Sequence, residues 1–220
     1  MCGRFALHAT SEELASTFGL AFGDFRVEAR YNIAPGQWIV IIRPSRDRGR
    51  IAGISRWGLV PSWAKDPEEG PKPINARAEG IAEKATFRGA LRHGRCLIPA
   101  SGFFEWKGAG KAKQPHFIHP TDAPVFAFAG LSSTWAGFSG ELDTCAIITT
   151  TPNPHMAAIH DRMPVILPPE AWTAWLDAET PTRELLALLR PCASERLASH
   201  PVSSRVGHVV HDDAGLIQPE

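Results

Sequence analysis

The sequence predicts an α+β fold, a single domain with a curved, mainly antiparallel, barrel-like β-sheet and short peripheral helices. Segments typical of strands outnumber helical ones, do not alternate with them as in a parallel α/β fold, and are separated by turns rich in Gly and Pro. The chain has 220 residues, of which 44% are hydrophobic and 21% charged. This size and composition suit one compact core, so we expect one domain over residues 1–220.

The N-terminal part is expected to hold one helix and one hairpin. Thr10 followed by Glu13 is typical of a capping box, which predicts a short helix that ends at Gly19. β-Branched runs at 37–43 and 51–57 are separated by the polar loop PSRDRGR. This pattern predicts a hairpin with a fairly long turn.

The rest of the chain is expected to add strands and then to end in helices. A helical pattern at 86–92 closes at Gly94, while segments 168–176 and 181–189 begin with Pro and carry apolar residues at helical spacing. Further strands are predicted at 95–98, 102–107, 116–119, 125–131 and 143–150.

Charge and targeting signals narrow the class of protein. Lys and Arg together number 23, as do Asp and Glu, so nucleic-acid binding would have to depend on local rather than global charge. The N-terminus lacks the pattern of a secretory signal, and the longest apolar runs are too short to cross a bilayer. We therefore expect a cytoplasmic protein that does not contact membranes and that is associated with the nucleoid when bound to DNA. We also expect it to be monomeric.

The four cysteines show no CxxC pair and no paired spacing. This arrangement argues against a zinc site or a disulfide framework, and we expect neither a metal nor a cofactor. Cys96 and Cys145 lie in apolar strand segments and are expected in the core.

Cys2 is the main candidate for chemistry. A small residue after Met1 favours removal of Met1, which would leave a free aminothiol at the start of the mature chain. An N-terminal amine has an ordinary pKa of about 7.7–8.0, against about 10.4 for lysine, so much more of it is neutral at pH 7. Such an amine can form an imine with an aldehyde, and the thiol can then close a thiazolidine ring. Position alone favours the alternative that the cysteine is incidental.

Polar residues within otherwise structural segments are further candidates. Asn75 and Arg77 lie in INARAEG, which we expect to form a loop, and Glu105 lies between Phe104 and Trp106 in a strand. Burial would raise the pKa of the Glu105 carboxyl and suit it to general acid–base catalysis. A place on the solvent face of the strand would instead make it structural.

His160, Asp161 and Arg162 lie between a short apolar segment and a strand that starts at a Pro. The His160 imidazole could titrate near neutral pH in a functional site, or it could form a salt-bridged turn with Asp161. Adjacency in the sequence does not decide whether the two side chains meet.

Other His and Trp residues are expected to be mainly structural. His116 and His119 should point to opposite faces of a strand, which does not suit chelation of one metal ion. Trp57 and Trp63 flank a Pro turn, where an exposed ring could stack on an unpaired base.

Six segments resemble, in order, the motifs of the SOS response-associated peptidase (SRAP) family of abasic-site processing proteins. They are MCGRF, RYNIAPGQ, WGLVPSWAK, INARAE, CLIPASGFFEW and IHDRMPVIL, and together they span residues 2–167. The resemblance implies an SRAP-like fold that binds single-stranded DNA at abasic sites. It also implies a covalent thiazolidine crosslink between the N-terminal cysteine and the ring-opened sugar, with peptidase-like exposure of Cys2 and lyase-type activity.

The resemblance also implies residue roles. Cys2 would form the covalent bond, Asn75 would hold the N-terminal amine or the sugar, Glu105 would be the acid and base, and His160 would assist ring opening or reversal. The DNA-binding residues expected are Arg4, Arg77 and Arg162 at phosphates, Thr149 near the DNA backbone, Trp106 in the pocket, and Trp63 as an exposed stacking residue.

Four positions depart from the family pattern. Gly36 and Gly80 stand where Thr is expected, Phe104 replaces Tyr, and Gly207 replaces Asn. None of these changes removes a reacting group. Loss of the Tyr hydroxyl and the Asn side chain is expected to weaken a hydrogen bond near the pocket or in the C-terminal tail.

Two functions of other classes remain open. The first is an N-terminal-nucleophile peptidase or amidohydrolase, in which Cys2 attacks an acyl carbon with its own amine as the base. The second is a non-catalytic binder of modified bases, which would bind without forming a covalent product and would not need Cys2.

Overall fold

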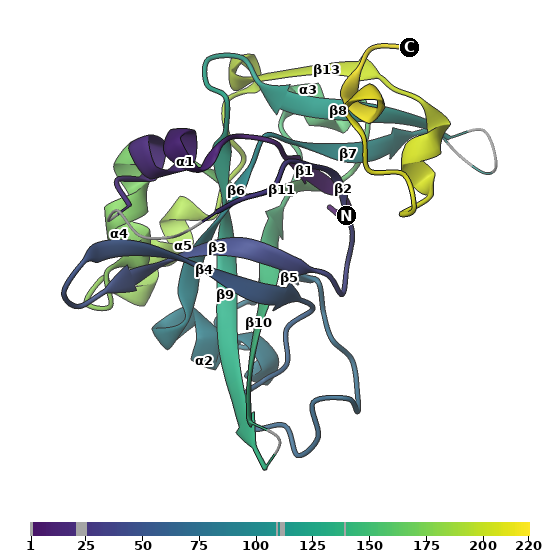
Figure 1. Ribbon diagram of the computed structural model, residues 1–220. Helices are drawn as coiled ribbons and strands as arrows, with labels where there is room; N and C mark the ends of the chain where they lie inside the picture. Colours follow the sequence, from purple (N-terminus) through teal and green to yellow (C-terminus); the bar gives the residue numbers. More distant parts are fainter. Residues whose placement is uncertain (1, 21–25, 109, 111–112, 139) are drawn as a thin grey trace.

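The computed structural model describes residues 2–20, 26–108, 110, 113–138 and 140–220. It contains a small β-barrel, a second antiparallel sheet packed against it, and short helices around the outside (Figure 1). The α+β, mainly antiparallel and barrel-like fold expected from the sequence is confirmed. Among the described residues, no helix is long and apolar enough to cross a membrane.

Five strands close the barrel. In pairing order they are β10 (Gly140–Thr150), β4 (Gly49–Trp57), β3 (Trp38–Ser45), β6 (Arg95–Ala100) and β9 (Phe126–Gly137), which pairs again with β10. All of these pairs are antiparallel except β10–β4. Short strands β5 (Asn75–Arg77) and β11 (Met163–Pro164) pair with the end of β10, and β12 (Ile166–Leu167) pairs with β9.

The second sheet carries the N-terminus. Its order is β13 (Leu197–Pro201), β8 (Gln114–Pro120), β7 (Gly102–Lys107), β1 (Phe5–Leu7) and β2 (Arg30–Ile33). β1 therefore has a strand on each side, although it is only three residues long. This double pairing fixes the backbone next to Cys2.

The two faces of this sheet are buried against different partners. On the barrel side, the Phe5 ring meets the rings of Trp57 and Phe128 at centroid distances of 5.3 and 6.0 Å. On the outer side, the C-terminal segment covers a separate apolar cluster made of Ala6, Phe104, Phe117, Val202, Val206 and Leu216. Neighbouring residues of β7 thus belong to different environments.

Short helices surround the barrel. They are α1 (Ser11–Phe18), α2 (Ala85–His93), α3 (Pro154–Ala157), α4 (Trp172–Leu176) and α5 (Thr182–Leu188), with 3-10 turns η1 (Pro169–Ala171), η2 (Ser194–Arg196), η3 (Ser204–Gly207) and η4 (Ala214–Ile217). The predicted capping box is confirmed, because Thr10 Oγ1 accepts from the Glu13 N–H and Glu13 Oε2 accepts from the Thr10 N–H. Helix α1 ends at Gly19, whose φ of 61° is left-handed.

Three local predictions were wrong. The β3–β4 turn is short, because Ser45 pairs directly with Gly49 and the polar loop residues continue both strands. Residues 75–77 of INARAEG form β5 rather than a loop, because their backbone pairs in parallel with β10. The chain does not end in helices, since β13, η3 and η4 follow α5, and β13 pairs with β8 across the chain.

Candidate active site

Cys2 lies just before β1, where two neighbouring strands hold the backbone. In the chain that begins with Met1, which lies outside the described residues, the Cys2 side chain has no exposed surface. Burial first, and the negative charge of Glu105 second, raise the pKa of the thiol. The Cys2 carbonyl accepts a hydrogen bond of 2.9 Å from Asn75 Nδ2, so β5 anchors the residue from a second element.

Glu105 lies within β7 on the face turned toward the barrel, as does Phe103 two residues earlier. The residue is only 3% exposed. Burial raises the pKa of its carboxyl, and the interaction with His160 partly opposes that shift. The expectation that Glu105 is desolvated is confirmed. A raised pKa of this carboxyl suits it to general acid–base catalysis.

His160 brings an imidazole to the same place. Its Nε2 lies 3.7 Å from Glu105 Oε2, and its Nδ1 lies 2.9 Å from Asp161 Oδ1. The adjacent side chains His160 and Asp161 therefore do meet. The backbone N–H of Arg162 also donates to His160 Nδ1 over 3.0 Å. The Arg162 N–H is a donor that needs a lone pair on Nδ1, whereas the Asp161 carboxylate is an acceptor that needs a proton on Nδ1.

Arg162 is held by several acceptors rather than extended into solvent. Its Nη1 and Nη2 donate to the two carboxylate oxygens of Glu79 over 2.8 and 2.9 Å, and Nη2 also donates to the Thr149 carbonyl over 2.8 Å. The hydrogen bond with Arg162 is the main cause that lowers the pKa of Glu79. Arg77, exposed on β5, pairs with Thr149 in the β5–β10 register.

Several buried polar atoms of this site have no hydrogen-bond partner among the described residues. They are Arg4 Nε, Asn75 Oδ1, Thr149 Oγ1 and Arg162 Nε. Because an unmade buried hydrogen bond costs about 1–3 kcal/mol, such atoms are uncommon in a finished core. Asn75 contacts the Cys2 carbonyl, and Thr149 and Arg162 lie on the strand beside β5 and on the segment bonded to that strand. Unmet hydrogen bonds on such neighbouring elements are typical of a site that binds a polar ligand.

Other expected site residues lie elsewhere. Trp106 is on the opposite face of β7 from Glu105 and packs against the C-terminal cluster that contains Phe104. The Phe104 ring, where the family pattern has Tyr, is therefore also turned away from Glu105. Trp63 is 67% exposed and remains available for stacking, whereas Trp57 is fully buried and the expectation that it could stack is wrong.

Arg4 links three distant parts of the chain. Its Nη1 donates to Asn32 Oδ1 over 2.7 Å and to the Val206 carbonyl over 2.6 Å, and its Nη2 donates to the Gly207 carbonyl over 3.5 Å. The backbone at Gly207 makes this contact whatever its side chain. Arg4 thus ties the start of the chain to β2 and to the C-terminal segment.

Sequence reasoning missed two residues near the site. Glu79 was not considered because nothing local indicates that it pairs with Arg162, more than eighty positions away. His116 is the direct partner of Glu105 in the β7–β8 register, which places both on one face. Its Nδ1 is buried without a partner among the described residues, and burial lowers its pKa. Only the strand register could have revealed this neighbour.

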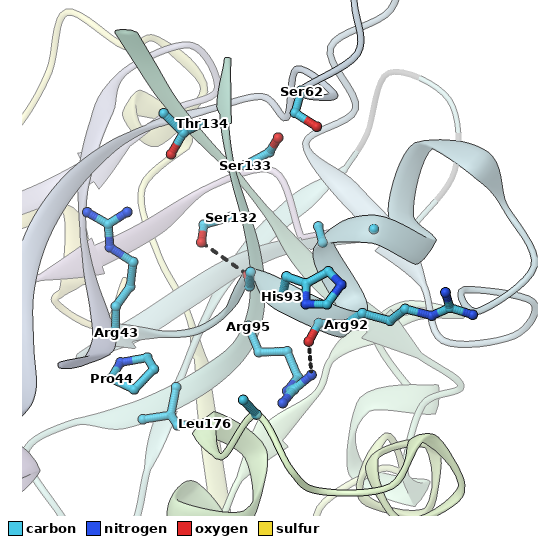
Figure 2. Close-up of a pocket in the computed structure, with 14 residues that line it drawn as sticks. Arg43, Pro44, Ser62, Arg92, His93, Arg95, Ser132, Ser133, Thr134 and Leu176 are labelled. Carbon is cyan, nitrogen blue, oxygen red and sulfur yellow. Dashed lines mark hydrogen bonds between the residues drawn. The ribbon is translucent and has the colours of Figure 1, made fainter. Parts of the chain in front are cut away.

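A hollow of about 450 Å³ lies beside α2, away from the Cys2 site. Figure 2 shows that Arg43, Arg95 and Ser132 line it, and none of the expected site residues does so. Its buried guanidinium is satisfied internally, because Arg95 donates to the carbonyls of Leu91, Arg92, Trp175 and Asp177. Ser132 Oγ donates to the Gly94 carbonyl, and Arg43 pairs with Asp143 at 3.1 Å.

Comparison with known proteins gives consistent matches. A family model described as SOS response associated peptidase (SRAP) matches residues 1–209. Abasic site processing protein YoaM of Bacillus subtilis (strain 168) is 41% identical over 225 residues, covering 100% of this chain and 99% of the relative. Abasic site processing protein YedK of Escherichia coli (strain K12) is 34% identical over 226 residues and is covered fully, as is this chain. A crystal structure of a Bacteroides thetaiotaomicron protein superposes with a TM-score of 0.90 at 28% identity, covering 100% of both chains.

Proposed function

The chain belongs to the SOS response associated peptidase family, and on this premise we propose that it captures abasic sites in single-stranded DNA as a covalent thiazolidine at Cys2. The observation that carries the proposal is the convergence of Cys2, Glu105 and His160 in one buried site with unmet hydrogen-bonding capacity. The relatives are abasic site processing proteins, which suggests the lesion, and the residues of this chain supply the chemistry.

The reaction begins once Met1 has been removed. The neutral amine of Cys2 adds to the C1′ aldehyde of the ring-opened sugar and forms a carbinolamine. Burial raises the pKa of Glu105, which suits its carboxyl to act as the general acid. The carboxyl donates a proton to the departing hydroxyl, water leaves, and the resulting carboxylate takes the proton from the nitrogen, so that an imine forms. The Cys2 sulfur then adds to the imine carbon while its proton passes to nitrogen, which closes the ring. Overall, one C–N and one C–S bond form and one water is released.

The other site residues assist this sequence in the proposal. Asn75 Nδ2 donates to the Cys2 carbonyl and so holds the Cys2 backbone, while Asn75 Oδ1 is left to accept from the amine or the sugar. His160 exchanges protons with Glu105 and assists ring opening and reversal. Arg4, Arg77 and Thr149 supply contacts to the DNA strand, with Trp63 stacking on a neighbouring base.

Intact-mass spectrometry with abasic single-stranded DNA tests the proposal. We expect a protein that lacks Met1 and an adduct equal to the protein plus the oligonucleotide less one water, stable to denaturation. Cys2→Ser should form no stable adduct. Cys192→Ser is the matched control, because Cys192 is a half-buried thiol next to α5 that the mechanism does not use. Equal adduct yield from Cys2→Ser would reject the thiazolidine.

The same samples separate the remaining activities. Retention of Met1 in Glu105→Gln, together with its loss in the wild type, would indicate peptidase-like self-exposure of Cys2. Shortened DNA would indicate lyase-type strand cleavage beside the lesion. Binding of abasic DNA that survives Cys2→Ala without any wild-type adduct would instead support a non-catalytic binder.

A further inference from the structure

The ion pair between Glu79 and Arg162 is unusually well formed for a residue pair at the edge of a site. The two carboxylate oxygens accept from the two Nη atoms over 2.8 and 2.9 Å, which is the bidentate fork that gives an Arg–carboxylate pair its directionality. The Arg162 side chain is 12% exposed and that of Glu79 is 53% exposed. Partial burial of the guanidinium reduces the solvent screening that weakens surface pairs.

This pair joins segments on the two sides of one strand. Glu79 follows β5, and Arg162 precedes β11, and these two short strands lie on opposite edges of β10. The Thr149 carbonyl on β10 accepts from both Arg162 Nη2 and the Ala78 N–H, each over 2.8 Å. Glu79 therefore locks the segment that carries Arg162 onto the end of β10.

The locked segment also carries His160. The Arg162 N–H donates to His160 Nδ1, so the neutral imidazole keeps its lone pair on Nδ1 and its proton on Nε2, the nitrogen that faces Glu105. Asp161 contacts the same Nδ1, but its side chain is 88% exposed and is free to turn into solvent. The backbone N–H is the fixed partner, and its position depends on where Arg162 is held.

We propose that Glu79 is a positioning residue that acts through Arg162 to hold His160 in the Nε2–H tautomer, with that proton directed at Glu105. This inference rests on the proposed function for its catalytic consequence, although the tautomer itself does not depend on the reaction. It assigns a task to a carboxylate that touches none of the reacting atoms.

A competing arrangement gives effects of the opposite sign. If Glu79 only occupied Arg162 in place of a DNA phosphate, its removal would free the guanidinium and strengthen DNA binding. Loss of a positioning contact leaves binding nearly unchanged and slows the proton transfer. The direction of the change in affinity therefore distinguishes the two.

The test compares Glu79→Gln with the wild type in three measurements. In ¹H–¹⁵N spectra of the imidazole nitrogens, we expect His160 to change from the Nε2–H tautomer to a mixture. The rate of adduct formation with abasic single-stranded DNA should fall about tenfold, as expected for a misplaced catalytic group. Affinity for DNA with a tetrahydrofuran lesion, which lacks the aldehyde, should change less than about twofold, as expected when no substrate contact is lost.

Glu83→Gln is the matched control, because Glu83 is an exposed carboxylate nearby that forms no ion pair with the described residues. It should leave all three measurements as in the wild type. An unchanged tautomer in Glu79→Gln, or a severalfold gain in affinity with an unchanged rate, would overturn the inference. If the wild type forms no adduct, the proposed function fails, but the tautomer measurement still decides the role of Glu79.

Discussion

The Cys2 site and the hollow beside α2 both contain buried polar groups, but the hydrogen bonding of these groups differs between the two regions. Around Cys2, the side chains of Asn75, Thr149 and Arg162 keep buried atoms without partners among the described residues. Beside α2, the buried guanidinium of Arg95 donates to four backbone carbonyls, two in α2 and two at the end of α4. The first arrangement leaves bonds for a ligand to make, whereas the second uses them to hold the fold together.

This difference in hydrogen bonding matters more than the volume of the hollow. A cavity whose charges are already satisfied gains little from a polar ligand, because each new hydrogen bond replaces an existing one. A site with unmet bonds is destabilised in the free protein and recovers that free energy on binding. Substitutions in the two regions should therefore separate stability from chemistry.

The largest expected effect on stability lies in the hollow beside α2. Arg95→Met should lower the free energy of unfolding by about 3 kcal/mol, because several buried carbonyls would lose their donor. Adduct formation measured well below the melting temperature should stay within about twofold of the wild type, since a lost stabilising contact leaves transition-state binding intact. Denaturant unfolding and single-turnover rates provide the two readings, with exposed Arg92→Met as the control. A large loss of rate in Arg95→Met would contradict the claim that this region supports the fold and not the chemistry.

The largest expected effect on chemistry lies at Glu105. Glu105→Gln should slow adduct formation about 100-fold, which corresponds to about 2.7 kcal/mol, because the general acid is lost. DNA affinity should be nearly intact, and a large loss of affinity would indicate a structural role instead. Glu141→Gln, at an exposed position on β10, is the control.

The pH profile sharpens this prediction. Burial raises the pKa of Glu105, so the acid form is present below that pKa and is lost as pH rises through it. The wild-type rate should therefore rise as the N-terminal amine loses its proton, with an ordinary pKa of about 7.7–8.0, and carry a falling limb from Glu105. That limb should be absent in Glu105→Gln. A profile of unchanged shape would argue against Glu105 as the acid.

A smaller effect is expected at the anchor of Cys2. Asn75→Ala removes the hydrogen bond to the Cys2 carbonyl and should slow adduct formation about tenfold, or about 1.4 kcal/mol. The melting temperature should change little, because Asn75 is only partly buried. Stopped-time gels with abasic DNA give the rate, and a rate equal to the wild type would remove Asn75 from the mechanism.

The smallest effect is expected at the rim of the hollow. Arg43 and Asp143 form a salt bridge whose side chains are 32% and 29% exposed. Arg43→Gln should cost less than about 1 kcal/mol of stability, and the difference should shrink in high salt. A loss of several kcal/mol, or any loss of DNA capture, would show that this region does more than support the fold.

The elements that the sequence predicts well are those with local causes. The capping box of Thr10 and Glu13 and the strand around Glu105 follow from residues next to one another, and both are present. The parallel pairing of β5 with β10 leaves no pattern in the local sequence, so residues 75–77 were predicted to form a loop. For the same reason Glu79 and His116 could not be predicted as site residues, because their partners are brought to them by pairing between segments that are distant in sequence.

The sequence also did not show which face of the sheet each side chain of β7 occupies. Trp106 follows Glu105 directly, and the family motif places them together, but alternation along β7 turns them to opposite sides of the sheet. The prediction that Glu105 is desolvated did not need this information, because both faces of β7 are covered. The prediction that Trp106 lines the pocket did need it.

The strand that follows Cys2 pairs with a strand that is synthesised about a hundred residues later. β1 can pair with β7 only after residues 102–107 have left the ribosome, which at about 5–20 residues per second takes at least about 5–20 s. Until then β7 does not hold the backbone next to Cys2. In the proposed function, removal of Met1 by an aminopeptidase would therefore precede this pairing, because the Cys2 side chain has no exposed surface in the folded chain that begins with Met1.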